Sequence, residues 1–315
     1  MDIYNSIAEK TPHFASNRII NSNVDFETLR QEFELIQSNS LRHCVFRGVN
    51  EAKYKLYNSA QREWASWDMG TIGENYEDHI INMINSCKNS ESLLEKYYKR
   101  LGIIRNDWLI LSFLQHYSAP SPLLDFSKDY KTAFFFASSN VNGNHGNTDD
   151  ISNYISIYYF EFVNEAKKIE TLVHYAKRTI APMPAVSGRD TQIWDDELSY
   201  ERVMQDCDAL LIPSYSHVTE LKNSNHSIVT KLMTSNLRST CQDGEFVCSK
   251  SQNEPVEDLF QRKGAKLHCV NIHKALAHYI ENTMFDGAIE NARQKYFQNE
   301  EDIAHLAKLK FLLLN

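Results

Sequence analysis

The chain has 315 residues, of which 42% are hydrophobic and 23% charged, a balance typical of a globular protein with a sizeable core. Its 33 basic and 41 acidic residues give a net charge of −8, which argues against a general nucleic-acid-binding surface. No apolar run approaches the roughly 20 residues of a membrane-spanning helix, and the first residues lack a signal-peptide pattern. We therefore expect a cytoplasmic protein without membrane or nucleic-acid partners.

The cysteine and histidine spacing gives no sign of a metal site. None of the six cysteines forms a Cys-x-x-Cys pair, and isolated cysteines in a reducing compartment are usually small buried hydrophobes. His273 and His278 are five residues apart, which does not place two ligands on one helix face. The sequence also lacks the glycine motifs of P-loop and Rossmann proteins and a serine nucleophile elbow.

Helical periodicity dominates the first half of the chain. Apolar side chains recur there three and four residues apart, and Asp25 and Asp107 stand where N-caps are expected. Strand-favouring residues at 43–49 end near a glycine, and a second short strand at 123–126 follows a proline-rich segment. The predicted helices of this half are 25–36, 74–87, 91–101, 108–117 and 128–138.

Strand-like segments dominate the second half, where 154–163, 209–212, 227–233, 245–249 and 266–272 are predicted strands. Predicted helices there are 165–178, 273–281, 284–297 and 300–313, with loops at 141–150 and 181–190. This distribution predicts an α+β fold, with a helix-rich N-terminal half and a strand-rich C-terminal half around a mixed sheet. We expect one domain over residues 1–315; the alternative is a division near 141–150.

Three segments contain most of the residues that could carry chemistry. The first is Phe46-Arg47-Gly48. The second, at 115–127, reads QHYSAPSPLLDFS and is followed by AFFFA at 133–137; the third, at 236–246, combines N-x-R with Q-x-G-x-F. In this order the segments resemble the FRG domain family, which is named for its Phe-Arg-Gly tripeptide. The resemblance covers about 40–140 and extends more weakly to about 250.

The second segment also departs from the family pattern. Ser118 replaces the usual glycine, Phe126 a tryptophan and Ser127 a threonine. Pro122 stands where the family usually has an arginine. If that arginine binds a phosphate or a carboxylate, this chain has lost or relocated the contact.

Arg47 has two interpretations. Because it lies near the end of a predicted strand and precedes Gly48, its guanidinium could clamp a phosphate or carboxylate where the backbone allows close approach. Alternatively, Arg47 is partly buried and pairs with Asp125 or another acid, which would hold the strand to a helix.

The second segment places further polar side chains near a predicted sheet edge. Gln115, His116 and Tyr117 end an apolar helix. Because the ordinary pKa of histidine lies near neutrality, His116 is a candidate general acid or base, or a structural hydrogen-bonding group. Asp125 and Ser127 precede the next predicted helix, whose N-terminus they could cap or use to hold an anion.

The same constellation is similar to ADP-ribosyltransferases. In one branch of that superfamily a strand arginine holds the NAD phosphates, a serine-containing strand supports the nicotinamide ribose, and a glutamate assists catalysis. Here Arg47, Ser127 and the segment 242–245 stand in those places, although the paired E-x-E is missing. A carboxylate such as that of Glu245 would stabilise the cationic ribose, and the catalytic candidates are His116 and Glu245.

Two functions therefore remain open. The first is an FRG-domain enzyme of bacterial defence, an NAD glycohydrolase or ADP-ribosyltransferase, for which NAD is the substrate and no cofactor is required. The second is a non-catalytic module that binds a nucleotide or a protein partner; RNA binding is a third, weaker candidate, against which the net charge weighs. The expected ligand-binding residues are Arg47, Gly48, Gln115, Tyr117, Asp125, Ser127 and Gln242.

Overall fold

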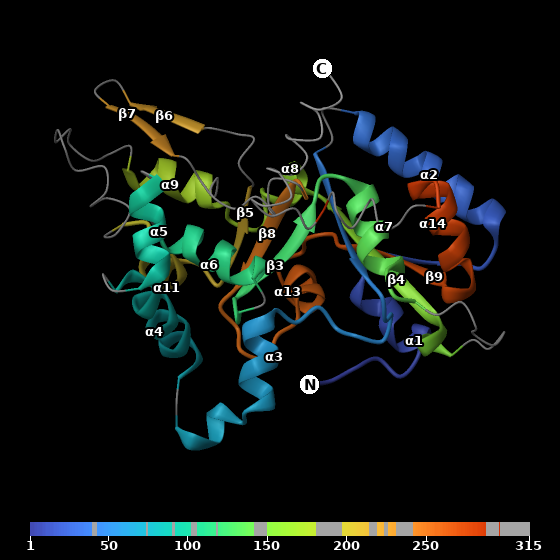
Figure 1. Cartoon of the computed structure of the whole chain (residues 1–315), viewed down its shortest axis with the longest axis horizontal. Coiled ribbons are helices and arrows are strands. Elements are labelled where there is room, and N and C mark those ends of the chain that lie inside the picture. The colour runs from blue at the N-terminus through green and yellow to red at the C-terminus, as the bar shows by residue number, and fades with distance from the viewer. Residues whose placement is uncertain are drawn as a thin grey trace, which may run out of the picture.

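The computed structural model describes residues 1–39, 43–73, 75–89, 92–101, 106–117, 119–141, 150–180, 197–213, 219–223, 226–230, 242–287 and 296. Within them a central sheet carries helices on both faces (Figure 1). Its strands are β1 (Ser16–Ile20), β2 (Cys44–Val49), β3 (Leu123–Ser127), β4 (Tyr154–Glu161), β5 (Ala209–Ile212), β8 (Gly244–Ser249) and β9 (His268–His273). A separate pair consists of β6 (Thr219–Asn223) and β7 (His226–Thr230).

The helices of the described residues lie between and around these strands. They are α1 (Ile7–Lys10), α2 (Asn23–Ser38), α3 (Ser59–Ser66), α4 (Tyr76–Lys88), α5 (Leu93–Leu101), α6 (Asp107–His116), α7 (Tyr130–Ser138), α8 (Phe162–Glu165), α9 (Leu172–Ile180), α11 (Tyr200–Asp206), α13 (Val256–Arg262) and α14 (Ala277–Phe285). Short 3-10 helices are η1 (Thr11–His13), η2 (Met69–Ile72), η3 (Ile151–Asn153) and η4 (Lys274–Leu276).

The main sheet has seven strands in the order β1-β9-β4-β2-β3-β8-β5. Only β1 and β9 are parallel; the other neighbours are antiparallel. The sheet is thus mixed, and the predicted α+β class is confirmed. Strands from the helix-rich first half and the strand-rich second half of the chain are interleaved in this order, so both halves build one sheet.

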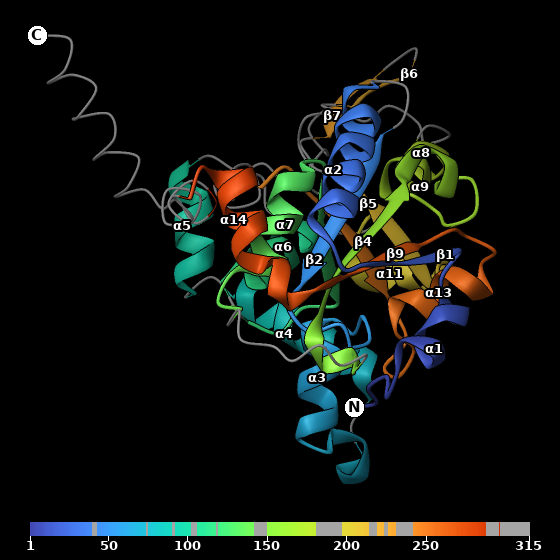
Figure 2. The ribbon, with the colours of Figure 1, turned by 90° about the vertical axis from the view of Figure 1, so that its right-hand side faces the viewer.

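Helices cover both faces of the sheet, as Figure 2 shows with α7 and α14 on one side of β4 and β9 and α13 on the other. On the first face, Phe33 of α2 packs its ring against Phe46 of β2, with centroids 5.0 Å apart. Over β3, β8 and β5, the same face is covered by α4, α6 and α11. On the opposite face, Phe260 of α13 packs against Phe160 of β4, with centroids 4.9 Å apart.

The contact between β2 and β3 interrupts the sheet. These strands share a single register pair, Phe46 with Ser127, whereas β2 pairs with β4 from Cys44 to Val49 and β3 pairs with β8 along its whole length. Because the ladder stops after one pair, β2 and β3 diverge and leave a gap between two half-sheets. The candidate site lies at this gap.

The predicted N-caps were wrong by one to four residues. Ser22, not Asp25, caps α2, since its hydroxyl accepts from the backbone N–H of Asp25 at 3.2 Å. Likewise Asn106, not Asp107, caps α6. Asp129 caps α7 in place of Asp125 or Ser127. An N-cap needs extended backbone and a side-chain acceptor, whereas acidic residues in the first turn are favoured by the helix dipole alone.

Several predicted boundaries also shift. The strand predicted at 154–163 ends at Glu161 and continues as α8, so the helix expected at 165–178 becomes α8 and α9. The strand predicted at 227–233 is β7, and the helix predicted at 273–281 becomes η4 and α14. The loop at 181–190, the helix at 300–313 and most of the segments 141–150 and 284–297 lie outside the described residues.

Gly48 lets α7 lie directly on β2. A Cβ atom at this position would stand 1.7 Å from the carbonyl oxygen of Ala133 and 2.9 Å from the backbone nitrogen of Ala137. Both obstacles are backbone atoms, so a side chain could enter only if the helix moved. The close approach expected at Gly48 is therefore made by α7.

Replacing Gly48 with alanine should destabilise the fold by about 3 kcal/mol or more, the upper range for overpacking a core, because helix and strand would have to separate. Gly70→Ala is the matched control: its nearest neighbour would be 3.9 Å away, so a change within about 0.5 kcal/mol is expected. Urea unfolding of both variants measures the difference, and equal stabilities would refute the contact.

Candidate functional site

Arg47 spans the gap between the two half-sheets. Its Nη1 donates to the Asp125 backbone oxygen at 2.7 Å and to Asp125 Oδ2 at 2.9 Å. The side chain of Arg47 is only 17% exposed, and its Nε is buried without a hydrogen-bond partner. The structural ion pair expected as one interpretation of Arg47 is thus present, and a buried donor remains beside it.

Asp125 is held in place from a second direction. The side-chain amide of Gln115 donates to Asp125 Oδ1, and the hydroxyl of Ser59 donates to Gln115 Oε1 at 3.2 Å. Burial alone would raise the pKa of Asp125, but the positive charge of Arg47 and then that of His116 outweigh burial and lower this pKa below its ordinary value. Gln115 and His116 therefore act on the Asp125 carboxylate.

A cavity of about 240 Å³ opens beside this ion pair on the face that carries α7. Arg47, Gly48, Asp125, Ser127 and Gln242, all predicted ligand-binding residues, line it together. The remaining lining residues are Phe46, Val49, Asn50, Phe126, Thr132, Ala133 and Phe136.

The side chains of Ser127 and Gln242 form hydrogen bonds with neighbouring segments of the chain. The hydroxyl of Ser127 donates to the backbone oxygen of Gln242 at 2.5 Å and accepts from the backbone N–H of Asp129 at 3.0 Å. The amide of Gln242 donates to the backbone oxygen of Tyr296 at 2.9 Å. Ser127 and Gln242 thus build the cavity wall, and Arg47 and Asp125 provide its charged groups.

The other predicted ligand-binding or catalytic side chains do not line this cavity. Gln115 donates a hydrogen bond to Asp125 but is not part of the cavity lining. His116 packs its ring against Phe246, with centroids 5.7 Å apart. Tyr117 is 45% exposed and stacks on Phe113 at 4.5 Å. A catalytic role for His116 stays a prediction.

Glu245 lies on the other face of the sheet. Its neighbour Gly244 is paired with Ser127, and because strand side chains alternate, Glu245 points away from the face that Ser127 occupies. The carboxylate is 1% exposed; His43 Nε2 lies 2.7 Å and Lys128 Nζ 3.1 Å from its Oε1. Glu245 therefore does not line the cavity, and its catalytic role stays a prediction.

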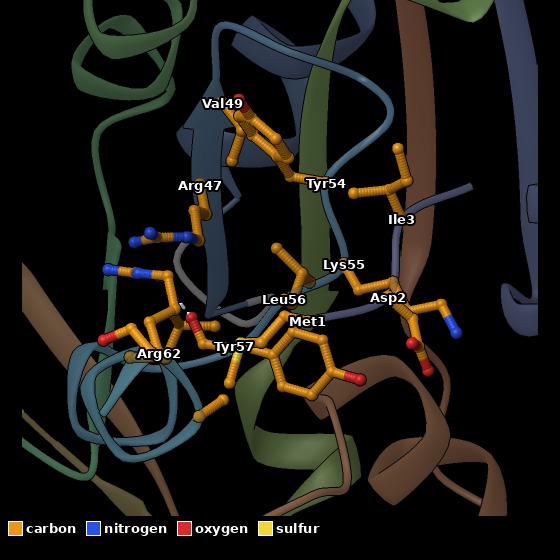
Figure 3. A pocket seen from close by; sticks show the side chains of 13 residues that line it. Met1, Asp2, Ile3, Arg47, Val49, Tyr54, Lys55, Leu56, Tyr57 and Arg62 are labelled. Carbon is orange, nitrogen blue, oxygen red and sulfur yellow. Dashed lines mark hydrogen bonds between the residues drawn. The ribbon is translucent and has the colours of Figure 1, made fainter. Parts of the chain in front are cut away.

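A larger cavity of about 580 Å³ lies on the other side of Arg47 (Figure 3). Arg62 of α3 points into it next to Arg47, and Tyr57 forms part of its wall. Apolar side chains from the sheet face that carries α13, such as Leu56 and Leu124, continue the wall. The other lining residues are Met1, Asp2, Ile3, Val49, Tyr54, Lys55, Ala65 and Ser66.

The sequence analysis missed Arg62, which is placed by a capping box. Asn58 and Gln61 exchange side-chain and backbone hydrogen bonds at the start of α3, and Gln61 Nε2 also bonds the backbone oxygens of Ser251 and Glu254 at 2.7 and 2.9 Å. The N-x-x-Q spacing of this box is the one signal that was available. This spacing predicts where α3 begins, but it does not predict that Arg62 lies next to Arg47.

Residues 42–145 match the family model of the FRG domain. The chain carries an FRG domain. No curated protein and no solved structure matches it.

The FRG tripeptide now has a physical account at each position. Phe46 packs under α2 and α7, Arg47 bridges the gap to Asp125, and Gly48 admits the backbone of α7. The second motif segment contributes Asp125 and the Gln115 that holds it. The first two motif segments thus meet at one point in the structure, the wall between the two cavities; residues 236–241 of the third segment lie outside the described residues.

Within the described part of the chain, no three metal-ligating side chains gather in one place. None of the described helices combines the length and apolarity needed to cross a bilayer.

Asp125→Asn should cost about 1–3 kcal/mol at neutral pH, the range for losing a charged hydrogen-bond partner. Because folding lowers the pKa of Asp125, its contribution is present above its ordinary pKa and is lost as the pH falls through the folded-state value. The wild type should therefore lose more stability on acidification than the variant. Urea unfolding from pH 7 to pH 3 measures this, with Asp78→Asn on the surface of α4 as control. Parallel pH profiles of wild type and Asp125→Asn would contradict the assignment.

Proposed function

We propose that the FRG domain binds NAD, with one end of the dinucleotide in the smaller cavity, and cleaves the bond between nicotinamide and ribose as a glycohydrolase or ADP-ribosyltransferase. The observation that carries the proposal is the buried Nε of Arg47, which has no partner and belongs to a side chain that lines the cavity. Buried donors are nearly always bonded, so an unbonded one beside a cavity favours an anionic ligand there.

The size of the cavity limits what enters it. At about 240 Å³ it is smaller than the roughly 300–1,000 Å³ of typical small-molecule sites. We therefore propose that the nicotinamide ribose and the adjacent phosphate occupy it and that the rest of the dinucleotide lies outside. Asn50 and Thr132 at its rim could bond the ribose hydroxyls.

The ion pair supplies the chemistry in this proposal. Asp125 is bonded by Nη1 of Arg47, whereas the unbonded donor is Nε. A phosphate at Nε would neutralise the guanidinium and weaken its attraction for Asp125, so ligand binding would loosen the Asp125 carboxylate. A carboxylate next to the ribose stabilises the positive charge that develops as the C1′–N bond breaks and nicotinamide leaves with the bonding electrons. Water or an acceptor hydroxyl then attacks C1′ and gives up its proton, which Asp125, the carboxylate that lines the cavity, could accept.

A second candidate function is a non-catalytic module that binds the same ligand. It is favoured by the position of the carboxylates: Asp125 is already bonded by Arg47 and Gln115, and Glu245 lies outside the cavity. In this alternative Asp125 stays paired and the bound nucleotide is not cleaved. A cytoplasmic role in bacterial defence, as the resemblance implies, would suit either function.

Wild-type protein incubated with NAD should release nicotinamide, measured by chromatography. Arg47→Ala should slow release by about 100-fold or more, the usual effect of removing a donor that stabilises developing charge. Phe136→Trp should also block release, because it fills the smaller cavity without touching the ion pair. The matched control is Arg178→Ala, whose side chain is 56% exposed and pairs with Glu170, and it should act like wild type.

Circular dichroism and melting temperature establish that each variant is folded. If Arg47→Ala does not fold, Arg47→Lys keeps the charge but loses the paired geometry and should still be impaired. Full release by folded Phe136→Trp would overturn the site. A melting shift with NAD but no release would support the binding module, and the absence of both would refute both functions.

A further inference from the structure

We propose that the larger cavity, shown in Figure 3, is a second ligand site that takes a small aromatic molecule bearing a phosphate group. This inference does not depend on NAD cleavage. The site is joined to the smaller cavity by Arg47, which lines both.

The charges of the cavity favour an anion. Arg47 and Arg62 line its wall, together with Lys55, whose ammonium lies over the Tyr4 ring at 5.3 Å. The lining contains the single carboxylate of Asp2, although the whole chain carries a net charge of −8. Among the described residues no carboxylate pairs with Arg62, whose Nη1 donates to the Tyr57 backbone oxygen at 2.5 Å. Two arginines that line one cavity, one of them paired with Asp125, form a site suited to a phosphate.

The positive charges of Arg47 and Arg62 also affect each other. Partial burial, followed by the charge of Arg47, lowers the pKa of Arg62, and Asp125 only partly offsets this effect. Like charges held close together repel each other, so an anion that bonds both guanidiniums would relieve the repulsion. A dianionic phosphate between the two arginines would therefore be electrostatically favourable.

The rest of the wall favours an aromatic ring. The volume of about 580 Å³ lies within the range of small-molecule sites. Tyr57 is mostly buried, whereas Tyr54 is 46% exposed at the rim, and both rings offer faces for stacking. Aliphatic side chains of Val49 and Leu56 complete an apolar wall next to the cationic end.

Hydrogen bonds from distant elements hold this wall in place. The backbone N–H of Leu56 donates to both carboxylate oxygens of Glu257, at 3.2 and 3.1 Å. The Tyr4 hydroxyl donates to the same carboxylate at 2.8 Å, and Ile3 forms an antiparallel bridge with Tyr54. The N-terminal segment and the segment around Leu56 are thus fixed together, as expected of a largely preformed site.

Arg47 links the two cavities energetically. A phosphate in the larger cavity would draw the Arg47 guanidinium away from Asp125 and from the smaller cavity. A ligand that needs Arg47 in the smaller cavity would then bind less well, and the linkage must be reciprocal. The two sites should therefore compete for one side chain without overlapping in space.

Phenyl phosphate tests the second site by isothermal titration calorimetry on the full chain, without NAD. It should bind at least tenfold more tightly than inorganic phosphate, which lacks the aromatic ring, or benzyl alcohol, which lacks the phosphate group. Arg62→Gln should weaken phenyl phosphate binding at least tenfold. Ala65→Trp should abolish binding, because Ala65 is an exposed cavity-lining residue of α3 and the indole would fill the space.

Two controls separate this site from the proposed NAD site. Phe136→Trp fills the smaller cavity and should leave phenyl phosphate binding unchanged, and Arg178→Gln removes a distant exposed guanidinium and should have no effect. Equal affinities for phenyl phosphate and inorganic phosphate would overturn the proposal, as would wild-type binding by folded Ala65→Trp. Loss of binding in Phe136→Trp would assign the ligand to the smaller cavity and also overturn it. Failure to cleave NAD would leave each of these outcomes unaffected.

Discussion

The ion pair between Arg47 and Asp125 is the interaction on which this structure depends. It spans the place where β2 and β3 stop pairing. The side chain of Arg47 therefore joins the two strands where backbone hydrogen bonds join neighbouring strands elsewhere in the sheet. One nitrogen of the guanidinium, Nη1, bonds both the backbone oxygen and the carboxylate of Asp125. Arginine also differs from lysine in keeping further donors, such as Nε, beside this pair.

The two other members of the FRG tripeptide keep Arg47 in this position. Phe46 anchors the strand in the core below α2 and α7, and Gly48 brings α7 to the strand at backbone distance. Because side chains alternate along β2, core packing on one face directs Arg47 toward the other and into the gap. The tripeptide therefore combines residues that pack the core with an arginine that we propose binds a ligand.

Local sequence patterns predicted those strands whose own residues favour a strand. The apolar run at 209–212 is β5 and the segment at 43–49 is β2, and the motifs drew attention to Arg47, Asp125 and Ser127. By contrast, β1 reads SNRII without clear alternation and exists because β9 supplies its partner. The face on which Glu245 lies depends on register, which a single sequence does not reveal.

Arg62 illustrates the same limit, because its meeting with Arg47 depends on how α3 packs. The backbone N–H of Ala60 donates to the Ser121 oxygen at 3.1 Å, which brings α3 against the start of β3 and next to buried Pro122. A second arginine thus reaches this region from another element, although the sequence has proline where the family pattern usually has arginine. A contact of this kind, between side chains of distant elements, cannot be read from spacing along the sequence.

The single register pair between β2 and β3 also makes this seam the softest line in the sheet. Opening it would break one backbone register pair and the side-chain contacts Arg47–Asp125, His43–Glu245 and Phe126–Phe160, whereas separating β2 from β4 would break a backbone ladder of six pairs. Collective motions follow the least costly path, so β1, β9, β4 and β2 form one plate that can hinge against the plate of β3, β8 and β5. The FRG motif lies on the hinge line, where a small rotation would widen one cavity as it narrows the other.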